Sequence, residues 1–83
     1  MIYAFDGYTP EIGEGTYVSE TAIVIGNVRI GDNCYIGPDT IIAKGVKIGA
    51  GSIIGANSFV NKSFPENSKI AGSPAKEIRR NDT

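Results

Sequence analysis

The chain has 83 residues, with eight basic and nine acidic side chains, no histidine and a formal charge of −1 at pH 7. A chain of this length forms one domain, and its near-zero charge gives no basic field for nucleic acid or anionic lipid. The sequence shows no signal-like N-terminus, no apolar stretch of about 20 residues and no second cysteine for a disulfide. We therefore predict a cytoplasmic protein that binds neither nucleic acid nor membranes.

The first eleven residues have the pattern of a cap. Residues 2–5 (Ile-Tyr-Ala-Phe) are typical of an edge strand, Asp6-Gly7 of a turn, and Pro10 follows. We predict that residues 1–11 protect the first open edge of the fold.

An aliphatic residue then recurs at every sixth position. The positions are Ile12, Val18, Val24, Ile30, Ile36, Ile42, Ile48, Ile54 and Val60. This period is neither the 3.6 of a helix nor the 2 of a lone strand, so the repeating unit is a short strand plus a turn. Three such units close a triangular coil, and residues 12–65 are predicted to form three coils of an all-β solenoid.

Two other positions of the repeat support this geometry. Four places after each aliphatic residue the side chain is mostly small or β-branched, as a narrow interior requires, and Cys34 is therefore predicted to fill the core rather than act as a nucleophile. Three places after it stands mostly Gly, Asn or Asp, which tolerate the positive φ of a corner.

The residue before each aliphatic position should point outward, and the three resulting columns differ. One column is Tyr17, Tyr35 and Ile53; a second is Ile23, Ile41 and Phe59; the third is Arg29, Lys47 and Pro65. Exposed apolar columns usually mark an interface, so the first two predict a homotrimer, in which a closed ring leaves no apolar face uncovered. Alternatively, the C-terminal tail covers one of the two.

The six-residue period of the sequence stops at Glu66. Beyond it the sequence predicts a turn at 65–68, a short strand at 69–71, and a short helix over residues 74–80, because Ser73-Pro74 is typical of a helix start. Residues 66–83 are thus predicted to form a C-terminal cap with a short helix.

The repeat resembles the bacterial hexapeptide-repeat family, whose fold is a left-handed parallel β-helix. Residues 1–37, with IYAFDGYTPEIGEGTYVSETAIVIGNVRIGDNCYIG, look like the opening of γ-class carbonic anhydrases. Residues 30–80, with IGDNCYIGPDTIIAKGVKIGAGSIIGANSFVNKSFPENSKIAGSPAKEIRR, look like the last coils and tail of hexapeptide acetyltransferases. The resemblance implies the left hand, and both kinds of relative carry several more coils.

The carbonic anhydrase resemblance implies zinc held by three histidines, and this sequence has none. We therefore expect no zinc, no other metal site and no carbonic anhydrase activity.

The acetyltransferase resemblance implies an acyl-CoA groove between neighbouring subunits. The positions that match it are Ala56 in Gly55-Ala56-Asn57-Ser58, then Asn61 and Lys62, then Lys76, Arg79 and Arg80. Small residues let the pantetheine arm lie on the backbone, and basic side chains suit phosphate. These residues also fit a solvated turn and an ordinary basic chain end, so both interpretations stay open, and acetyl-CoA is the cofactor that the first one implies.

The family's acetyltransferases use a histidine as general base, and this sequence offers only carboxylates such as Glu14, Glu20 or Asp32. We therefore predict a minimal trimeric hexapeptide-repeat protein without catalytic residues of the family type, with acyl-CoA binding at Ala56, Asn61, Lys62, Lys76 and Arg79 if the groove is kept. The alternatives are an active acetyltransferase with a non-histidine base and a truncated or designed structural scaffold.

Overall fold

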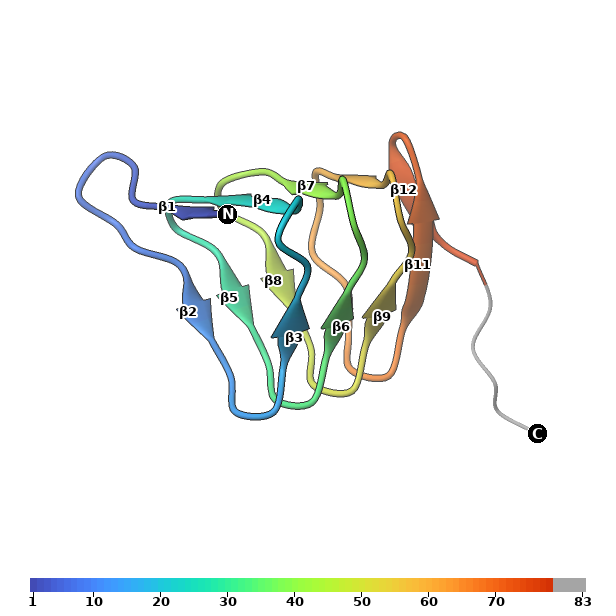
Figure 1. The fold of residues 1–83 in the computed structure, drawn as a ribbon. Coiled ribbons are helices and arrows are strands. Elements are labelled where there is room, and N and C mark those ends of the chain that lie inside the picture. Colours follow the sequence, from blue (N-terminus) through green and yellow to red (C-terminus); the bar gives the residue numbers. More distant parts are fainter. Residues whose placement is uncertain (79–83) are drawn as a thin grey trace.

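The structure is a computed structural model and describes residues 1–78. Strands of two to four residues wind into a triangular prism of about four turns, with successive turns side by side (Figure 1). No residue in this range is helical. The chain is thus an all-β parallel solenoid, as the six-residue period predicts.

Each side of the prism is a sheet of short strands contributed by successive turns. Face 1 consists of β1 (Ile2–Tyr3), β4 (Ile23–Ile25), β7 (Ile41–Ile42) and β10 (Phe59–Val60). Face 2 consists of β2 (Glu11–Ile12), β5 (Arg29–Ile30) and β8 (Lys47–Ile48). Face 3 consists of β3 (Tyr17–Val18), β6 (Tyr35–Ile36), β9 (Ile53–Ile54), β11 (Lys69–Gly72) and β12 (Ala75–Glu77). We name the corners by the faces they join: corner 1–2, corner 2–3 and corner 3–1.

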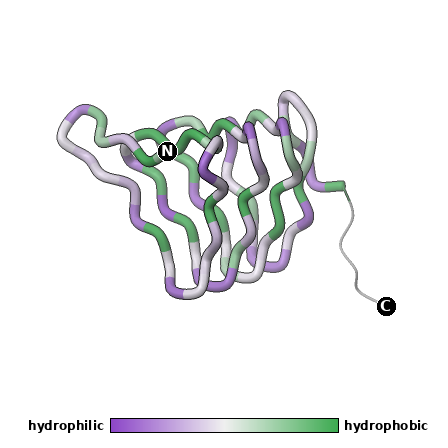
Figure 2. Tube along the Cα trace, viewed as in Figure 1, coloured by the Kyte–Doolittle hydropathy of each residue, from purple (hydrophilic) through white to green (hydrophobic). Residues whose placement is uncertain are grey.

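The core is the column of aliphatic residues inside the prism. Seven of the nine predicted positions are buried, and the other two, Ile12 and Val18, are partly buried because they lie in the first turn, which has a neighbouring turn on one side only. In Figure 2 the apolar residues follow the strands, whereas hydrophilic residues gather at the corners. Cys34 is 3% exposed, and its thiol lies 3.3 Å from the carbonyl oxygen of Gly49. Its prediction as a core residue is confirmed.

The corners use positive φ where the sequence predicts it. Of the nine predicted corner residues, six have positive φ: Gly15, Asn33, Asp39, Gly45, Gly51 and Asn57. Glycine and asparagine alternate in one column for a steric reason. A Cβ on Gly15 would collide with Oδ1 of Asn33 in the next turn, and a Cβ on Gly51 would collide with Oδ1 of Asn67.

The repeat does not stop at Glu66 but continues after a shortened corner. Val60 pairs with Ile42, 18 residues earlier, whereas Phe64 bridges to Ile48, only 16 residues earlier. The corner at 61–63 is therefore two residues short, and Phe64 takes the place of a core aliphatic residue. A further repeat unit then runs from Phe64 to Ile70, which pairs with Ile54.

The continued repeat corrects two predictions. The solenoid has about four turns rather than three, because β1 and β11 add to the repeat at its two ends. Pro65 does not extend the outward column of Arg29 and Lys47; Ser63 does, and its hydroxyl accepts a hydrogen bond from the backbone N–H of Lys47 at 2.8 Å.

The strand predicted at 69–71 is confirmed, but the helix predicted over 74–80 is wrong where the structure describes it. Ala75–Glu77 forms β12, which pairs antiparallel with β11. A helix of one or two turns is marginal by itself, whereas a returning strand satisfies the last open edge and buries Ala75. Residues 79 and 80 lie outside the described range.

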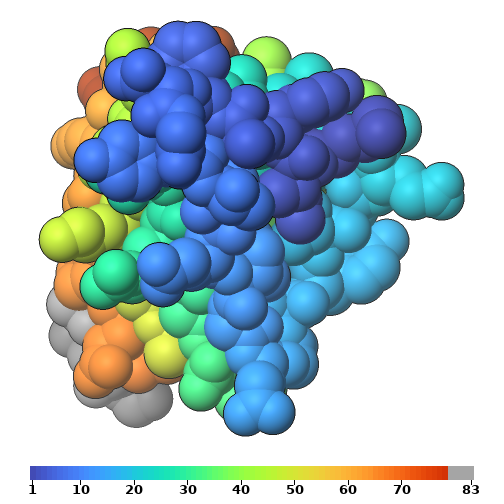
Figure 3. Space-filling model, turned by 90° about the vertical axis from the view of Figure 1, so that its left-hand side faces the viewer, coloured from blue at the N-terminus to red at the C-terminus, as the bar shows by residue number. Residues whose placement is uncertain are grey.

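At the opposite end the chain forms the predicted strand and turn. β1 pairs in parallel with β4, and Phe5 and Tyr8 exchange two backbone hydrogen bonds of 2.8 and 3.0 Å around Asp6-Gly7, both with positive φ. The N-terminal residues lie across the upper part of this end of the prism in Figure 3. We call residues 5–8 the N-terminal hairpin.

Candidate functional site

Two outward columns are apolar, as predicted. Tyr17 lies beside Tyr35, and Tyr35 beside Ile53, in the register of face 3. The two tyrosine rings stack with centroids 5.5 Å apart, and all three residues are exposed. On face 1, Ile41 is exposed, while Ile23 and Phe59 are partly buried. The chain up to Ile78 leaves Tyr17, Tyr35 and Ile53 uncovered, so within the described range the tail does not cover that column.

The residues predicted for acyl-CoA fall at two places. Ala56 is exposed at corner 3–1 of the third full turn. Lys76 is exposed on β12 opposite Ala71, and a Cβ on Gly55 would lie 3.5 Å from the Ala71 Cβ. Ala56 and Lys76 are therefore related through Ala71, which pairs with Lys76 and lies next to Gly55 at the C-terminal end of the prism.

Asn61 and Lys62 lie at the other end of β10, on the shortened corner 1–2. Both are exposed, and the Lys62 ammonium lies 5.5 Å from the centroid of the Phe64 ring. The structure thus places an exposed small-residue corner and an exposed basic corner at opposite ends of one strand, but does not bring them into a single cavity. Arg79 and Arg80 lie outside the described residues.

The three carboxylates considered as substitute bases are exposed on corners. Glu14 and Asp32 lie on adjacent turns of corner 2–3, where Oδ1 of Asp32 accepts a hydrogen bond from the backbone N–H of Glu14 at 2.9 Å. Glu20 lies on corner 3–1. Asp32 therefore has a structural role in joining two turns.

Two other kinds of feature are absent from residues 1–78. No three His, Cys, Asp or Glu side chains in this range group as metal ligands. The same range contains no helical segment that could span a membrane.

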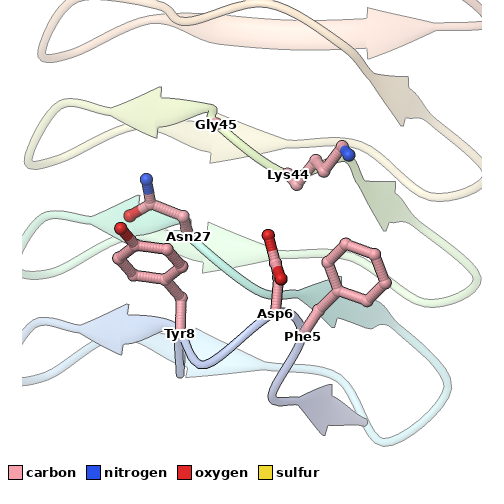
Figure 4. A pocket seen from close by; sticks show the side chains of 6 residues that line it. All are labelled: Phe5, Asp6, Tyr8, Asn27, Lys44 and Gly45. Carbon is pink, nitrogen blue, oxygen red and sulfur yellow. The ribbon is translucent and has the colours of Figure 1, made fainter.

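A pocket that the sequence does not predict lies between the N-terminal hairpin and corner 1–2. Its volume is about 330 Å³, and Phe5, Asp6, Tyr8, Asn27, Lys44 and Gly45 line it (Figure 4). The sequence signals only one part of this pocket, the Asp6-Gly7 turn. The pocket forms because the N-terminal hairpin folds against corner 1–2 of two later turns.

Solved structures similar to this chain are acyltransferases of the same architecture. A galactoside acetyltransferase in complex with coenzyme A is 30% identical over 93% of this chain and 48% of its own, with a TM-score of 0.73. The acetyltransferase domain of PglB from Neisseria gonorrhoeae, in complex with acetyl coenzyme A, is 30% identical over 76% of this chain and 31% of its own, with a TM-score of 0.74. The hexapeptide-repeat acetyltransferase VCA0836 from Vibrio cholerae is 24% identical over 98% of this chain and 68% of its own, with a TM-score of 0.74.

The chain is short relative to such proteins. It spans about a quarter of an Arabidopsis UDP-N-acetylglucosamine acyltransferase and about half of the Bacillus cereus N-acyltransferase AntD, at TM-scores of 0.82. No curated protein matches its sequence. The resemblance of residues 1–37 to γ-class carbonic anhydrases is not shown by these comparisons and stays a prediction.

The sequence itself carries the family signature over most of its length. The profile described as bacterial transferase hexapeptide (six repeats) matches residues 9–44 and again residues 27–62. These matches cover the repeat on all three faces of the prism, and the fold is that of the left-handed β-helix acetyltransferases. The chain belongs to the bacterial transferase hexapeptide family.

Proposed function

We propose that these 83 residues form a homotrimeric, cytoplasmic acyl-CoA-binding protein that does not transfer the acyl group by itself. The observation that supports this most is the 30% identity, over 93% of the chain, to a galactoside acetyltransferase in complex with coenzyme A. The acetyltransferase-like fold is established, whereas ligand binding, activity and assembly are the proposal.

The proposed binding surface is built around β10. At one end of the strand, the methyl side chain of Ala56 lets the pantetheine arm approach the backbone of corner 3–1, with Lys76 beside that corner. At the other end, Asn61 and Lys62 offer an amide and an ammonium to phosphate. Because the two groups do not share a cavity within one chain, the proposal places the groove between subunits. Arg79 is a proposed phosphate contact as well.

The proposal excludes turnover because acyl transfer to a hydroxyl or amine needs a positioned general base near the acceptor. The sequence contains no histidine, and Glu14, Glu20 and Asp32 are exposed on corners. An exposed carboxylate is a weak base at neutral pH. Acetyl-CoA hydrolysis or transfer should therefore stay at the background rate, which a thiol-reactive dye measures as released CoA. Release above background would favour an active enzyme with a non-histidine base.

The trimer would bury the apolar columns of faces 1 and 3. Tyr35 and Ile41 lie at the middle of the two columns and are 44% and 40% exposed in the single chain. A carboxylate placed in a buried apolar interface is strongly unfavourable. Tyr35→Glu and Ile41→Glu should each lower the mass measured by light scattering from three chains to one. A variant that keeps the trimeric mass would show that its column is not the interface.

The ligand site is tested with a matched pair of charge reversals. Lys62→Glu should abolish saturable binding of acetyl-CoA, because it replaces a phosphate partner with a like charge. Lys47→Glu makes the same charge change on face 2, outside the proposed site, and should leave the affinity within about twofold. Unchanged affinity in Lys62→Glu would refute this site. Absence of binding in the unmodified chain would favour a structural scaffold.

A further inference from the structure

The N-terminal pocket combines apolar walls with unpaired charges of both signs. Phe5 and Tyr8 flank the Asp6-Gly7 turn and are 48% and 55% exposed. Figure 4 shows Asp6 between the two aromatic rings, with Lys44 above Phe5 and Asn27 above Tyr8 in this view. Its volume of about 330 Å³ is at the lower end of the range for small-molecule sites.

The charged groups of this pocket do not neutralise each other. Within residues 1–78, Asp6 and Lys44 form no ion pair with each other or with any other residue. The contact that orients Lys44 is with an aromatic ring, since its ammonium lies 5.1 Å from the centroid of Phe5. Both charges therefore keep their hydrogen-bonding capacity for a ligand.

The backbone fixes this arrangement. Asp6 and Gly7 have positive φ, and the two hydrogen bonds between Phe5 and Tyr8 hold the hairpin closed. Opposite the hairpin, the Gly45 N–H donates to the Asn27 carbonyl oxygen at 2.8 Å, which ties together the two turns that carry the pocket wall. A Cβ on Gly45 would meet no atom within 4 Å, so the space above this residue is open.

We propose that this pocket binds a small zwitterion: a free α-amino acid with an aromatic or large apolar side chain. Asp6 receives the ligand's ammonium group, Lys44 receives its carboxylate, and the rings of Phe5 and Tyr8 pack against its side chain. A neutral ligand such as a sugar would use the rings but leave both charges unpaired. None of the residues assigned to acyl-CoA lines this pocket, so the two proposals fail independently.

The test uses L-phenylalanine as the probe and follows the backbone amide signals of the ¹⁵N-labelled protein. Saturable shifts should appear at Asp6, Gly7, Tyr8 and Gly45. Asp6→Asn and Lys44→Gln should each raise the dissociation constant by about 3–10-fold, because each removes one charge-assisted contact at a partly screened site. Asp39→Asn and Lys47→Gln are the matched controls. Asp39 is another exposed aspartate at positive φ, 58° against 54° for Asp6, and Lys47 is an exposed lysine outside the pocket.

Two analogues assign each charge to its partner. Phenethylamine lacks the carboxylate, so its weaker binding should be insensitive to Lys44→Gln; 3-phenylpropionate lacks the ammonium, so its binding should be insensitive to Asp6→Asn. The proposal is overturned by any of three results: no saturable shift with L-phenylalanine at millimolar concentration, equal binding in all four variants, or binding of methyl glucoside as tight as that of L-phenylalanine.

Discussion

Two glycines that follow core isoleucines predict opposite effects of the same added methyl group. Gly49 and Gly55 both have ordinary φ values, so alanine costs neither of them backbone strain. A Cβ on Gly49 would collide with the backbone nitrogen of Glu66 and lie 2.5 Å from its Cα, whereas a Cβ on Gly55 would lie 3.5 Å from the Ala71 Cβ. The first contact is with the backbone of the next turn, and the second is an ordinary van der Waals contact.

The size of the effect follows from the movement that Gly49→Ala requires. To reach 3.4 Å, the Cα of Glu66 must move by about 1 Å. That displacement opens two hydrogen bonds between the turns: Gly49 N–H to the Phe64 carbonyl oxygen (3.0 Å) and Asn67 N–H to the Ala50 carbonyl oxygen (2.9 Å). Each bond contributes about 1 kcal/mol net, and overpacking costs about 1–3 kcal/mol. The two costs do not simply add, because relaxation that relieves the overpacking also breaks the hydrogen bonds. We therefore expect Gly49→Ala to lower the free energy of unfolding by about 2–4 kcal/mol in total.

Gly55→Ala should be neutral or stabilise by up to about 1 kcal/mol, since it lowers only the entropy of the unfolded chain. The assay is urea unfolding followed by circular dichroism at one fixed protein concentration, because the proposed trimer would make the midpoint depend on concentration. Gly49→Ala should lower the thermal midpoint as well, by about 4–8 °C per kcal/mol. Equal midpoints for the two variants would refute the inferred stacking of residues 64–67 on residues 48–51.

Three further predictions follow from burial and register. Phe64→Ala should destabilise the protein by about 3–5 kcal/mol, because the ring is 7% exposed in a core position. Pro65→Ala, at an exposed residue, should change the stability by less than about 0.5 kcal/mol. If urea unfolding gave the reverse order, it would contradict the shortened corner. The Cys34 thiol, 3% exposed, should react with a disulfide reagent only after denaturant is added, and rapid reaction of the folded protein would contradict its burial. Arg29→Ala should lower the free energy of unfolding by less than about 0.5 kcal/mol despite the 3.4 Å ion pair with Glu11, because both side chains are at least 66% exposed. A loss of stability above about 1 kcal/mol would show that Arg29 makes a contact beyond that ion pair.

The features that repeat were predictable from the sequence. A six-residue period gives the strand, the corner and the inward side chain at once, so the core isoleucines and most corner residues follow from counting. The two apolar outward columns follow too, because each turn adds one residue to each column. Tyr35 is adjacent to Tyr17 and Ile53 for this reason.

The features that break the repeat were not predictable in the same way. Phe64 stands four places after Val60, where the repeat carries mostly small or β-branched residues, but the two-residue shortening before it is fixed only by the pairing with Ile48. Ser73-Pro74 is a local helix signal, and the antiparallel pairing of β12 with β11 overrides it. The repeat places Asn27 and Gly45 in adjacent turns of one corner, 18 residues apart, but no sequence spacing places Tyr8 of the N-terminal hairpin beside them.

Calorimetric titration of acetyl-CoA into the purified chain at low salt tests the central proposal most directly. Low salt is chosen because added salt would screen the proposed contacts of Lys62 and Lys76 with phosphate. The account predicts saturable heat with a stoichiometry near one ligand per chain, in a protein whose mass is that of a trimer. No heat at millimolar acetyl-CoA would contradict it, and the family fold would then serve a structural role without the cofactor.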